Sequence, residues 1–154
     1  LIMNQPKTIS EGVNYKAIDL GNFSELSQYA YNYPVRQVTI EGKVFTGKQL
    51  QSSGAEISFM IVPPHTGLPF LHAHRKHEEI YVIIRGSGQF QVDNDVFDIH
   101  EGSMIRVNPA GNRVYRNNSN ESMVFLCIQT MAGSLDCYVG SDGLRTDGVP
   151  VWEK

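Results

Sequence analysis

The sequence predicts an all-β protein, a sandwich or a barrel, and three observations carry this prediction. Short runs rich in β-branched and aromatic residues follow one another from residue 35 to residue 129. Gly, Asp, Asn and Pro separate these runs at short intervals, as they do in tight turns. Within this range no apolar pattern repeats at helical spacing. The number of runs suits a double-sheet jelly roll, which closes most of its strand edges.

Composition limits the class of protein and the kind of partner. A chain of 154 residues with 41% hydrophobic content is long enough for one compact domain with a core. Thirteen Lys and Arg against sixteen Asp and Glu give a net charge of -3 with no basic run. This argues against nucleic acid and anionic membranes as partners and favours a small-molecule ligand. No apolar run approaches the roughly 18 residues that cross a bilayer, and the first residues do not resemble a signal peptide, so we expect a cytoplasmic protein.

The first 34 residues precede the β-rich region and are predicted to form an arm. Residues 15–20 have the pattern of a short strand. Apolar residues then recur at helical spacing between the cap residue Asn22 and Pro34, which would end that helix. We expect residues 1–34 to pack on the barrel or on a neighbouring subunit, and residues 35–154 to form the single barrel domain with a C-terminal extension.

The barrel strands are predicted from alternation and from the turns between them. Residues 41–43 and 93–95 have the composition of tight turns, and Pro63 and Pro64 end the strand before them. The strands that we expect are residues 38–40, 44–46, 55–62, 79–84, 88–92, 96–99, 104–107, 113–116 and 122–129, with a last strand near residues 135–139.

The chemistry-bearing stretch lies before and within the fourth of these strands. His72 and His74 are two residues apart, so on an extended strand their imidazoles leave the same face. Residues 75–78 are polar and suit a turn, and a carboxylate at the start of the returning strand can then meet the histidine pair. Imidazole with carboxylate is the ligand set of Fe(II), Ni(II), Mn(II) or Zn(II), whereas Ca(II) and Mg(II) prefer oxygen alone.

This stretch resembles the first motif of the cupin family: a glycine, His-x-His, three or four residues, Glu, six residues and a second glycine. His72, His74, Glu79 and Gly86 fit the motif, and the leading glycine stands one residue closer than the family has it. The six residues before Gly86 select Glu79 over its neighbour Glu78.

A second stretch, residues 102–118, resembles the second cupin motif: a glycine, five residues, Pro-x-Gly, two residues, His, three residues and Asn. Counting from Pro109 places the expected histidine at Val114, and counting from Gly102 places it at Arg113. Neither count meets a histidine, so the family's last metal ligand is missing here. The resemblance covers residues 56–129.

The resemblance implies a double-stranded β-helix, that is, a cupin barrel, and a homodimer. It also implies a divalent metal, Fe, Ni, Mn or Zn, on His72, His74 and Glu79, with water or a substrate atom in the position of the missing histidine. Whether a metal is present stays open, because Val114 or Arg113 replaces that ligand.

A substrate pocket is expected next to these ligands. Tyr81 shares the face of Glu79 by alternation and should point into the barrel. We expect His77 to face solvent. Arg106, Arg113, Tyr115 and Arg116 are expected on the outer sheet, and the alternative is that one of them points inward and binds a carboxylate-bearing ligand. The candidates for an apolar pocket wall, for which core packing is the alternative, are Phe59, Phe70, Met104, Val114 and Phe125.

Three functions are consistent with these residues. The first is a metal-dependent enzyme, for which the resemblance implies dioxygenase-like, isomerase or decarboxylase chemistry. The second is a small-molecule binding or sensing module without turnover. The third is a metal-free scaffold in which the His-Glu cluster is a hydrogen-bonded network. Metal content separates the third from the others, and turnover separates the first from the second.

Overall fold

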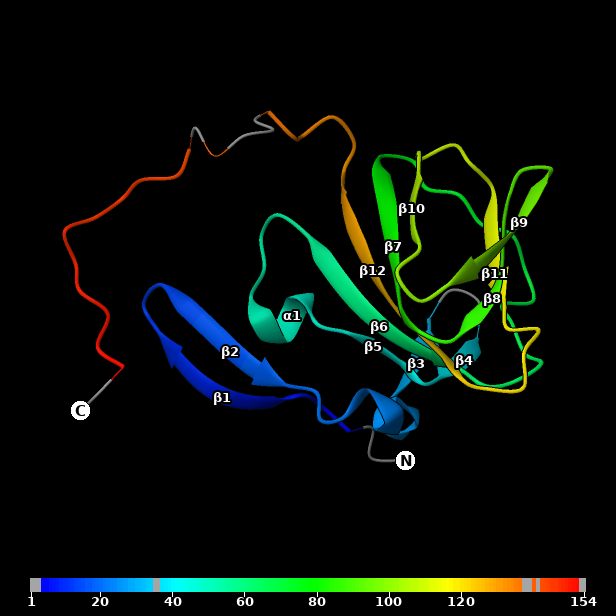
Figure 1. The fold of residues 1–154 in the computed structure, drawn as a ribbon, viewed down its shortest axis with the longest axis horizontal. Helices are drawn as coiled ribbons and strands as arrows, with labels where there is room; N and C mark the ends of the chain where they lie inside the picture. The colour runs from blue at the N-terminus through cyan, green and yellow to red at the C-terminus, as the bar shows by residue number, and fades with distance from the viewer. Residues whose placement is uncertain (1–3, 35–36, 137–139, 141, 153–154) are drawn as a thin grey trace.

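Two sheets face each other and enclose one core (Figure 1). The computed structural model describes residues 4–34, 37–136, 140 and 142–152. The larger sheet has the order β10-β7-β12-β6-β5 and the smaller one β11-β8-β9. The predicted all-β class is confirmed. The bounds of the larger sheet are β5 (Lys43–Phe45), β6 (Glu56–Val62), β7 (His77–Arg85), β10 (Met104–Val107) and β12 (Met123–Met131), and those of the smaller sheet are β8 (Ser87–Val92), β9 (Asp95–His100) and β11 (Arg113–Arg116).

The N-terminal segment is mostly extended. β1 (Lys7–Gly12) and β2 (Tyr15–Asp19) form a hairpin, which confirms the strand expected at residues 15–20. β3 (Ala30–Tyr33) pairs with β4 (Val38–Glu41), and a short helix α1 (Gly47–Leu50) follows β5. Figure 1 shows the β1-β2 hairpin reaching away from the two main sheets.

The prediction of a helix between Asn22 and Pro34 is wrong. A single stretch of 3-10 helix, η1 (Phe23–Gln28), replaces it, and the side chain of Asn22 makes no capping hydrogen bond. The backbone is already extended at Tyr29, and the tyrosine-rich run after it pairs with β4. Strand pairing of aromatic residues therefore outweighs the helical spacing of three apolar positions.

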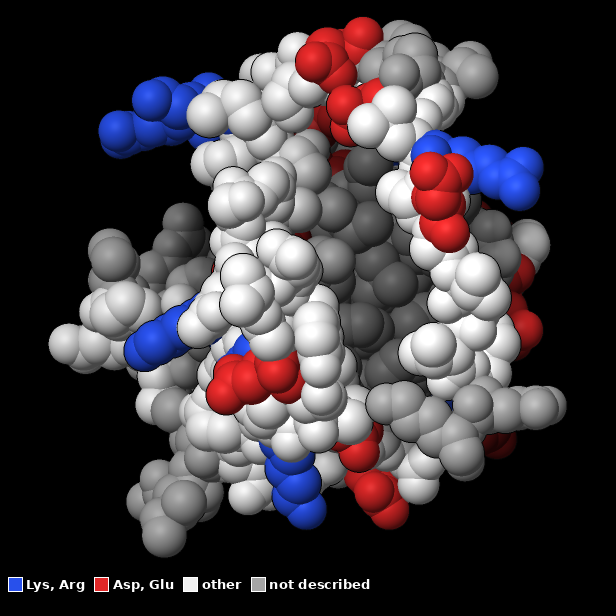
Figure 2. All heavy atoms as spheres, turned by 90° about the vertical axis from the view of Figure 1, so that its left-hand side faces the viewer, with Lys and Arg blue, Asp and Glu red and all other residues white. Residues whose placement is uncertain are grey.

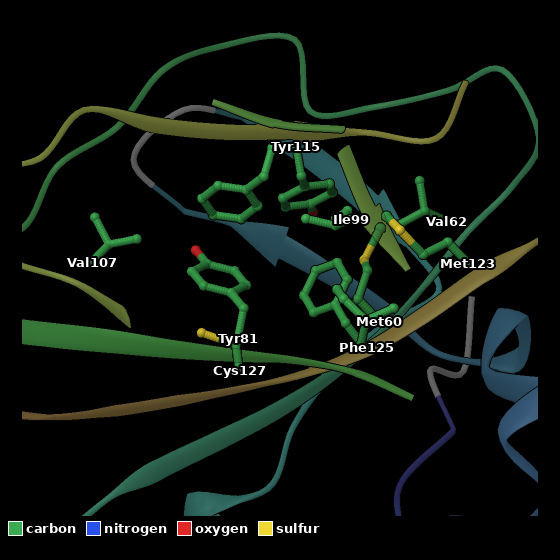
Figure 3. Packing of buried hydrophobic residues seen from close by; sticks show 11 residues of the cluster. Met60, Val62, Tyr81, Ile99, Val107, Tyr115, Met123, Phe125 and Cys127 are labelled. Carbon is green, nitrogen blue, oxygen red and sulfur yellow. The ribbon is translucent and has the colours of Figure 1, made fainter. Parts of the chain in front are cut away.

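Three central strands share one register, and this register sorts the inward-facing residues into layers. Gln129 stands opposite both Glu56 and Glu79. Two residues along, the paired positions are Cys127, Ser58 and Tyr81, and after them Phe125, Met60 and Ile83. The side chains thus change along the barrel from a polar layer, through a mixed one, to an apolar one. Figure 3 shows the result, with Tyr81 and Val107 at one end of the buried cluster and Val62 and Met123 at the other.

Gly86 explains why the first motif ends on a glycine. It connects β7 to β8 with φ of +83°, a conformation that side chains disfavour. A Cβ atom there would lie 2.6 Å from the carbonyl oxygen of Ser122. Only glycine fits this turn, which sets the direction in which β8 leaves the larger sheet.

The ends of the chain add little to the barrel. β12 continues to Met131, two residues beyond its predicted end. Of the last strand expected near residues 135–139, residues 137–139 lie outside the described residues, and residues 135 and 136 are not in a strand. Where the structure describes the chain, neither helix is long and apolar enough to span a membrane. Figure 2 shows one face of the molecule, on which Lys and Arg side chains lie apart around the edge.

Candidate functional site

His72, His74 and Glu79 converge at one point on the barrel wall. One ligand atom from each lies within 4.8 Å of the others. Nε2 of His74 is 3.2 Å from Oε1 of Glu79, and Nε2 of His72 is 3.7 Å from Oε2. Two ligand atoms that each lie about 2.1 Å from one metal ion are roughly 3 to 3.5 Å apart, so the His74 separation fits a shared ion and the His72 separation is slightly longer than this range.

The histidines do not lie on a regular strand, contrary to the sequence-based expectation. The segment between β6 and β7 contains turns and bends, and isolated bridges join Gly67 to Arg116 and His72 to Arg113. The N–H of His72 donates to the carbonyl of Arg113 at 3.2 Å, and the N–H of Arg113 donates back at 2.9 Å. The N–H of His74 donates to the carbonyl of Pro109. The histidine segment is therefore held by the second-motif region, and the two imidazoles still share a face.

The predicted turn at residues 75–78 is also shorter than expected. His77 is the first residue of β7 and is half-buried, so it does not project freely into solvent. Its backbone stands opposite Met131, the last residue of the neighbouring strand β12. β7 starts earlier than predicted because β12 pairs with it as far as His77, that is, beyond the apolar residues from which the strand was predicted.

Glu79 is an ionised carboxylate surrounded by donors. Burial would raise its pKa, but contacts from His72 and His74 and a hydrogen bond from Tyr81 outweigh burial and hold the pKa well below its usual range. The hydroxyl of Tyr81 donates to Oε2 at 2.6 Å. Burial and the nearby Cys127 and Glu79 raise the pKa of Tyr81, so this hydroxyl keeps its proton.

The imidazoles differ in their outer contacts. The amide nitrogen of Gln129 lies 3.0 Å from Nδ1 of His74 and 3.3 Å from Nε2. Nδ1 of His72 is buried and has no hydrogen-bond partner among the described residues. Metal-bound histidines almost always donate their other ring N–H to an oxygen acceptor, so His72 departs from that pattern.

Arg113 occupies the position of the missing histidine. It was expected on the outer sheet, but its side chain is 0% exposed and lies inside the barrel. Nε is 3.5 Å from Oε2 of Glu79, and NH2 donates to the carbonyl of Asn108 at 2.9 Å. NH1 has no hydrogen-bond partner within the part of the chain that the structure describes. Its bridge to His72 and its pairing with Val92 fix the alternation of β11, so Arg113 and Tyr115 point inward.

Val114 faces away from the candidate metal ligands. It is half-buried and lines a hollow on the other face of β11, together with Gln89, Gln91 and Arg116. The structure therefore turns Arg113, which the count from Gly102 selects, toward the cluster, and Val114, which the count from Pro109 selects, away from it.

A cavity of about 270 Å³ adjoins the cluster. We call it the barrel cavity. His72, Glu79 and Tyr81 form one part of its wall, and Tyr31 and Tyr33 of β3 form another. Burial and the neighbouring Glu79 raise the pKa of Cys127, which also lines the cavity, to about 12, so its sulfur stays a thiol. The other lining residues are Ile40, Lys43, Phe45, Glu56, Ser58, Leu68, Tyr115 and Gln129.

Of the six residues predicted for the pocket wall, Tyr81 lines the barrel cavity and the other five do not. Phe125 is buried in the apolar layer beyond the cavity. Phe59 lies on the opposite face of the sheet and stacks on Phe23, with ring centroids 5.1 Å apart. Met104 is 69% exposed, because β10 is the edge strand and turns this side chain outward. Phe70 packs near His72, with ring centroids 6.4 Å apart.

The sequence analysis missed Lys43 and Tyr115 as inward-facing residues. Lys43 was placed in a turn, but it is the first residue of β5 and faces the cavity. Lys43 stands two residues before Phe45 on the same strand, so both side chains face the cavity, and this spacing could have identified Lys43. Tyr115 lies two residues after Arg113 on the same strand, so the two side chains point to the same face and the orientation of either one predicts that of the other.

Comparison with known proteins matches this architecture. A family model described as a cupin domain matches residues 58–129. A cupin protein from Bacteroides fragilis, known from a crystal structure, is 35% identical in sequence to this chain. The match covers 75% of this chain and 98% of that protein, and the two structures superpose with a TM-score of 0.65. This chain belongs to the cupin family. The family's fold therefore applies to this cupin, and both motif regions lie within or next to the matched residues.

Two further matches are more limited. A structure from Thermotoga maritima, described as a predicted oxalate decarboxylase, is 18% identical over 85% of this cupin and 99% of that chain, with a TM-score of 0.54. At this identity the likeness shows the fold alone. An uncharacterized protein from Methanocaldococcus jannaschii is 35% identical over 57 residues, which are 37% of this chain and 46% of that protein. This cupin thus matches about half the length of that curated relative.

Proposed function

We propose that this cupin binds a divalent transition metal through His72, His74 and Glu79 and uses it on a small molecule held in the barrel cavity. The observation that supports this is the convergence of three ligand atoms within 4.8 Å on the wall of a cavity of about 270 Å³. Two histidines with one carboxylate and open coordination positions form the ligand set of non-haem iron enzymes.

A bound ion at this position supplies Lewis acidity or an oxygen-activating centre, which suits oxygenase, isomerase or decarboxylase chemistry. The chain's own residues prepare the site. Glu79 presents a full negative charge, and Tyr81 fixes its orientation with a short hydrogen bond. The three converging ligand atoms are two imidazole nitrogens and one carboxylate oxygen. The substrate would then enter between the cluster and the tyrosines of β3.

A second candidate is a metal-free module that binds or senses a small molecule in the same cavity. Arg113 favours it, because its guanidinium already places a positive charge 3.5 Å from Glu79, where the family has a metal ligand. A fixed cation beside the cluster opposes the binding of a divalent ion. The Nδ1 of His72, which has no partner among the described residues, also favours the metal-free module.

Metal content decides between these candidates. The tag-free protein, purified without chelator, is analysed for Fe, Ni, Mn and Zn and titrated with each ion by calorimetry. We expect one ion per chain, lost in His72→Ala with an affinity decrease of roughly 100-fold or more. His100→Ala is the matched control, because His100 is exposed at the end of β9. The metal proposal is rejected if no ion binds or if His72→Ala binds as tightly as the control, and the metal-free module then remains.

A further inference from the structure

Lys43 places a positive charge inside the barrel. It follows the turn residue Gly42 and begins β5, its side chain is 9% exposed, and it lines the barrel cavity. Its backbone stands opposite Met60, which in turn pairs with Phe125. Lys43 therefore belongs to an apolar layer, two layers away from that of Glu79.

The ammonium group has no anionic partner among the described residues. Nζ lies 5.0 Å from the ring centroid of Phe45 and 5.8 Å from that of Phe125. None of the described ion pairs, which extend to 4.0 Å, includes Lys43, and no described hydrogen bond reaches its Nζ. Aromatic faces attract a cation, but they replace only part of its hydration.

The two carboxylates that share the cavity are engaged elsewhere. Glu56 accepts hydrogen bonds from the backbone N–H groups of Thr46 and Gly47, at 3.2 and 2.7 Å. Glu79 contacts the two histidines and Arg113 and accepts the hydrogen bond from Tyr81. Neither carboxylate neutralises Lys43 at close range, so the cavity has an unmatched cation in its wall.

Such a cation is costly to keep without a function. A buried ammonium without a partner loses several kcal/mol of solvation relative to a paired or neutral group. Burial lowers the pKa of Lys43, although Cys127, Glu79 and Glu56 oppose this effect. An anionic ligand in the cavity would restore the balance, since it would add the missing negative charge beside Nζ.

We propose that Lys43 is the anion-binding residue of the barrel cavity and pairs with the carboxylate of a small, planar organic acid. The inference rests on the proposed function and names its substrate class. The volume of about 270 Å³ equals that of roughly nine water molecules, which suits an acid of about ten non-hydrogen atoms. Phe45, Tyr31 and Tyr115 supply aromatic wall around it, and its far end reaches toward His72 and Glu79.

Calorimetric titration with benzoate tests this inference, with benzamide and benzyl alcohol as neutral probes of similar shape and pyruvate as a smaller acid. The full chain is used after treatment with a chelator. We expect saturable benzoate binding, at least about tenfold tighter than binding of either neutral probe. Lys43→Met should abolish this preference and leave the affinity for benzyl alcohol unchanged, which shows that the cavity is intact.

Two variants provide matched controls. Lys48→Met makes the same change on an exposed lysine of α1 and should leave the preference for benzoate unchanged. Lys43→Arg keeps the charge and should retain part of the preference. Because Lys43→Met removes an unpaired buried charge, it should also raise the melting temperature, by about 2–4 °C, whereas Lys48→Met should not.

The outcomes separate this inference from the metal proposal. Benzoate preference that survives in His72→Ala and is lost in Lys43→Met supports the inference, whatever the metal content. Preference that is lost in His72→Ala and kept in Lys43→Met overturns it and leaves the metal proposal standing. Equal binding of benzoate and benzamide, or no saturable binding of either acid up to about 10 mM, also overturns it.

Discussion

The two ends of the barrel are built from the same three strands but have opposite chemistry. At the apolar end, β6, β7 and β12 contribute Met60, Val62, Ile83, Met123 and Phe125, all of them buried. At the cavity end, the same strands contribute Glu56, Ser58, Glu79, Tyr81, Cys127 and Gln129. Cross-strand pairing keeps each set in its own layers.

This difference shows how one sheet can carry both stability and chemistry. The apolar end is closed by contacts between the two sheets, such as that of Tyr115 with Phe125, whose ring centroids are 4.8 Å apart. Inside the barrel, the cavity end keeps the carboxylate of Glu79 beside Arg113, and Lys43 of the adjoining apolar layer lines the same cavity. Each of these charged groups loses solvation. We therefore expect changes at the apolar end to alter stability, and changes at the cavity end to alter binding, with stability effects of either sign.

The largest effect on stability is expected at the apolar end. Phe125→Ala removes a ring that is 1% exposed and contacts Tyr81 and Tyr115. Such a truncation should lower the free energy of unfolding by about 3–5 kcal/mol, because the cavity that it leaves collapses only in part. Urea unfolding measures it. A decrease below about 1 kcal/mol would show that this layer is loosely packed and that the comparison between the two ends does not hold.

Glu79→Gln is the counterpart at the cavity end. The change leaves the buried guanidinium of Arg113 without its carboxylate, which should cost about 3 kcal/mol at pH 7 and abolish metal binding. The pKa of Glu79 is lower in the folded protein than in the unfolded chain, so its stabilisation is complete above about pH 5 and declines as the pH falls. Unfolding curves of both proteins between pH 7 and pH 3 should therefore converge. Curves that stay parallel would mean that Glu79 is not specifically stabilised as an anion.

Arg113→His tests the position of the missing ligand. The imidazole would enter the cavity end beside Glu79 and remove a repelling cation, so Zn(II) or Fe(II) binding should tighten at least about tenfold, or roughly 1.4 kcal/mol. Val114→His is the matched control, since Val114 lies on the other face of β11 and should leave the metal affinity unchanged. Tighter binding in the control and not in Arg113→His would reverse our assignment of the inward face.

The smallest effect concerns Cys127, in the second layer of the cavity end. Burial raises its pKa to about 12, so its stabilisation is complete below the unfolded pKa near 9 and is lost as the pH rises from there toward 12. The difference in unfolding free energy between the wild type and Cys127→Ala should therefore shrink by about 1 kcal/mol between pH 8 and pH 10. An unchanged difference would indicate that the thiol is reached by solvent in the folded state.

The strands and the first motif could be predicted from local patterns. The alternation of residues 55–62 and the turn at residues 93–95 correspond to β6 and to the β8-β9 connection. Convergence of the histidines with Glu79 followed from spacing, although their segment is not a regular strand. The N-terminal helix failed because three apolar residues at helical spacing are weak evidence beside the pairing of β3 with β4.

By itself, the sequence determined the β class, the polar-to-apolar order along each strand and the three candidate ligands, because these depend on residues close together in one segment. Only the tertiary structure decided that Arg113 replaces the missing ligand and that Lys43 reaches the cavity. The parity of β11 is fixed by its bridge to His72 and its pairing with β8, and the surroundings of Lys43 are fixed by its register with Met60. Both depend on contacts between distant segments, where a shift of one residue would turn each side chain to the opposite face.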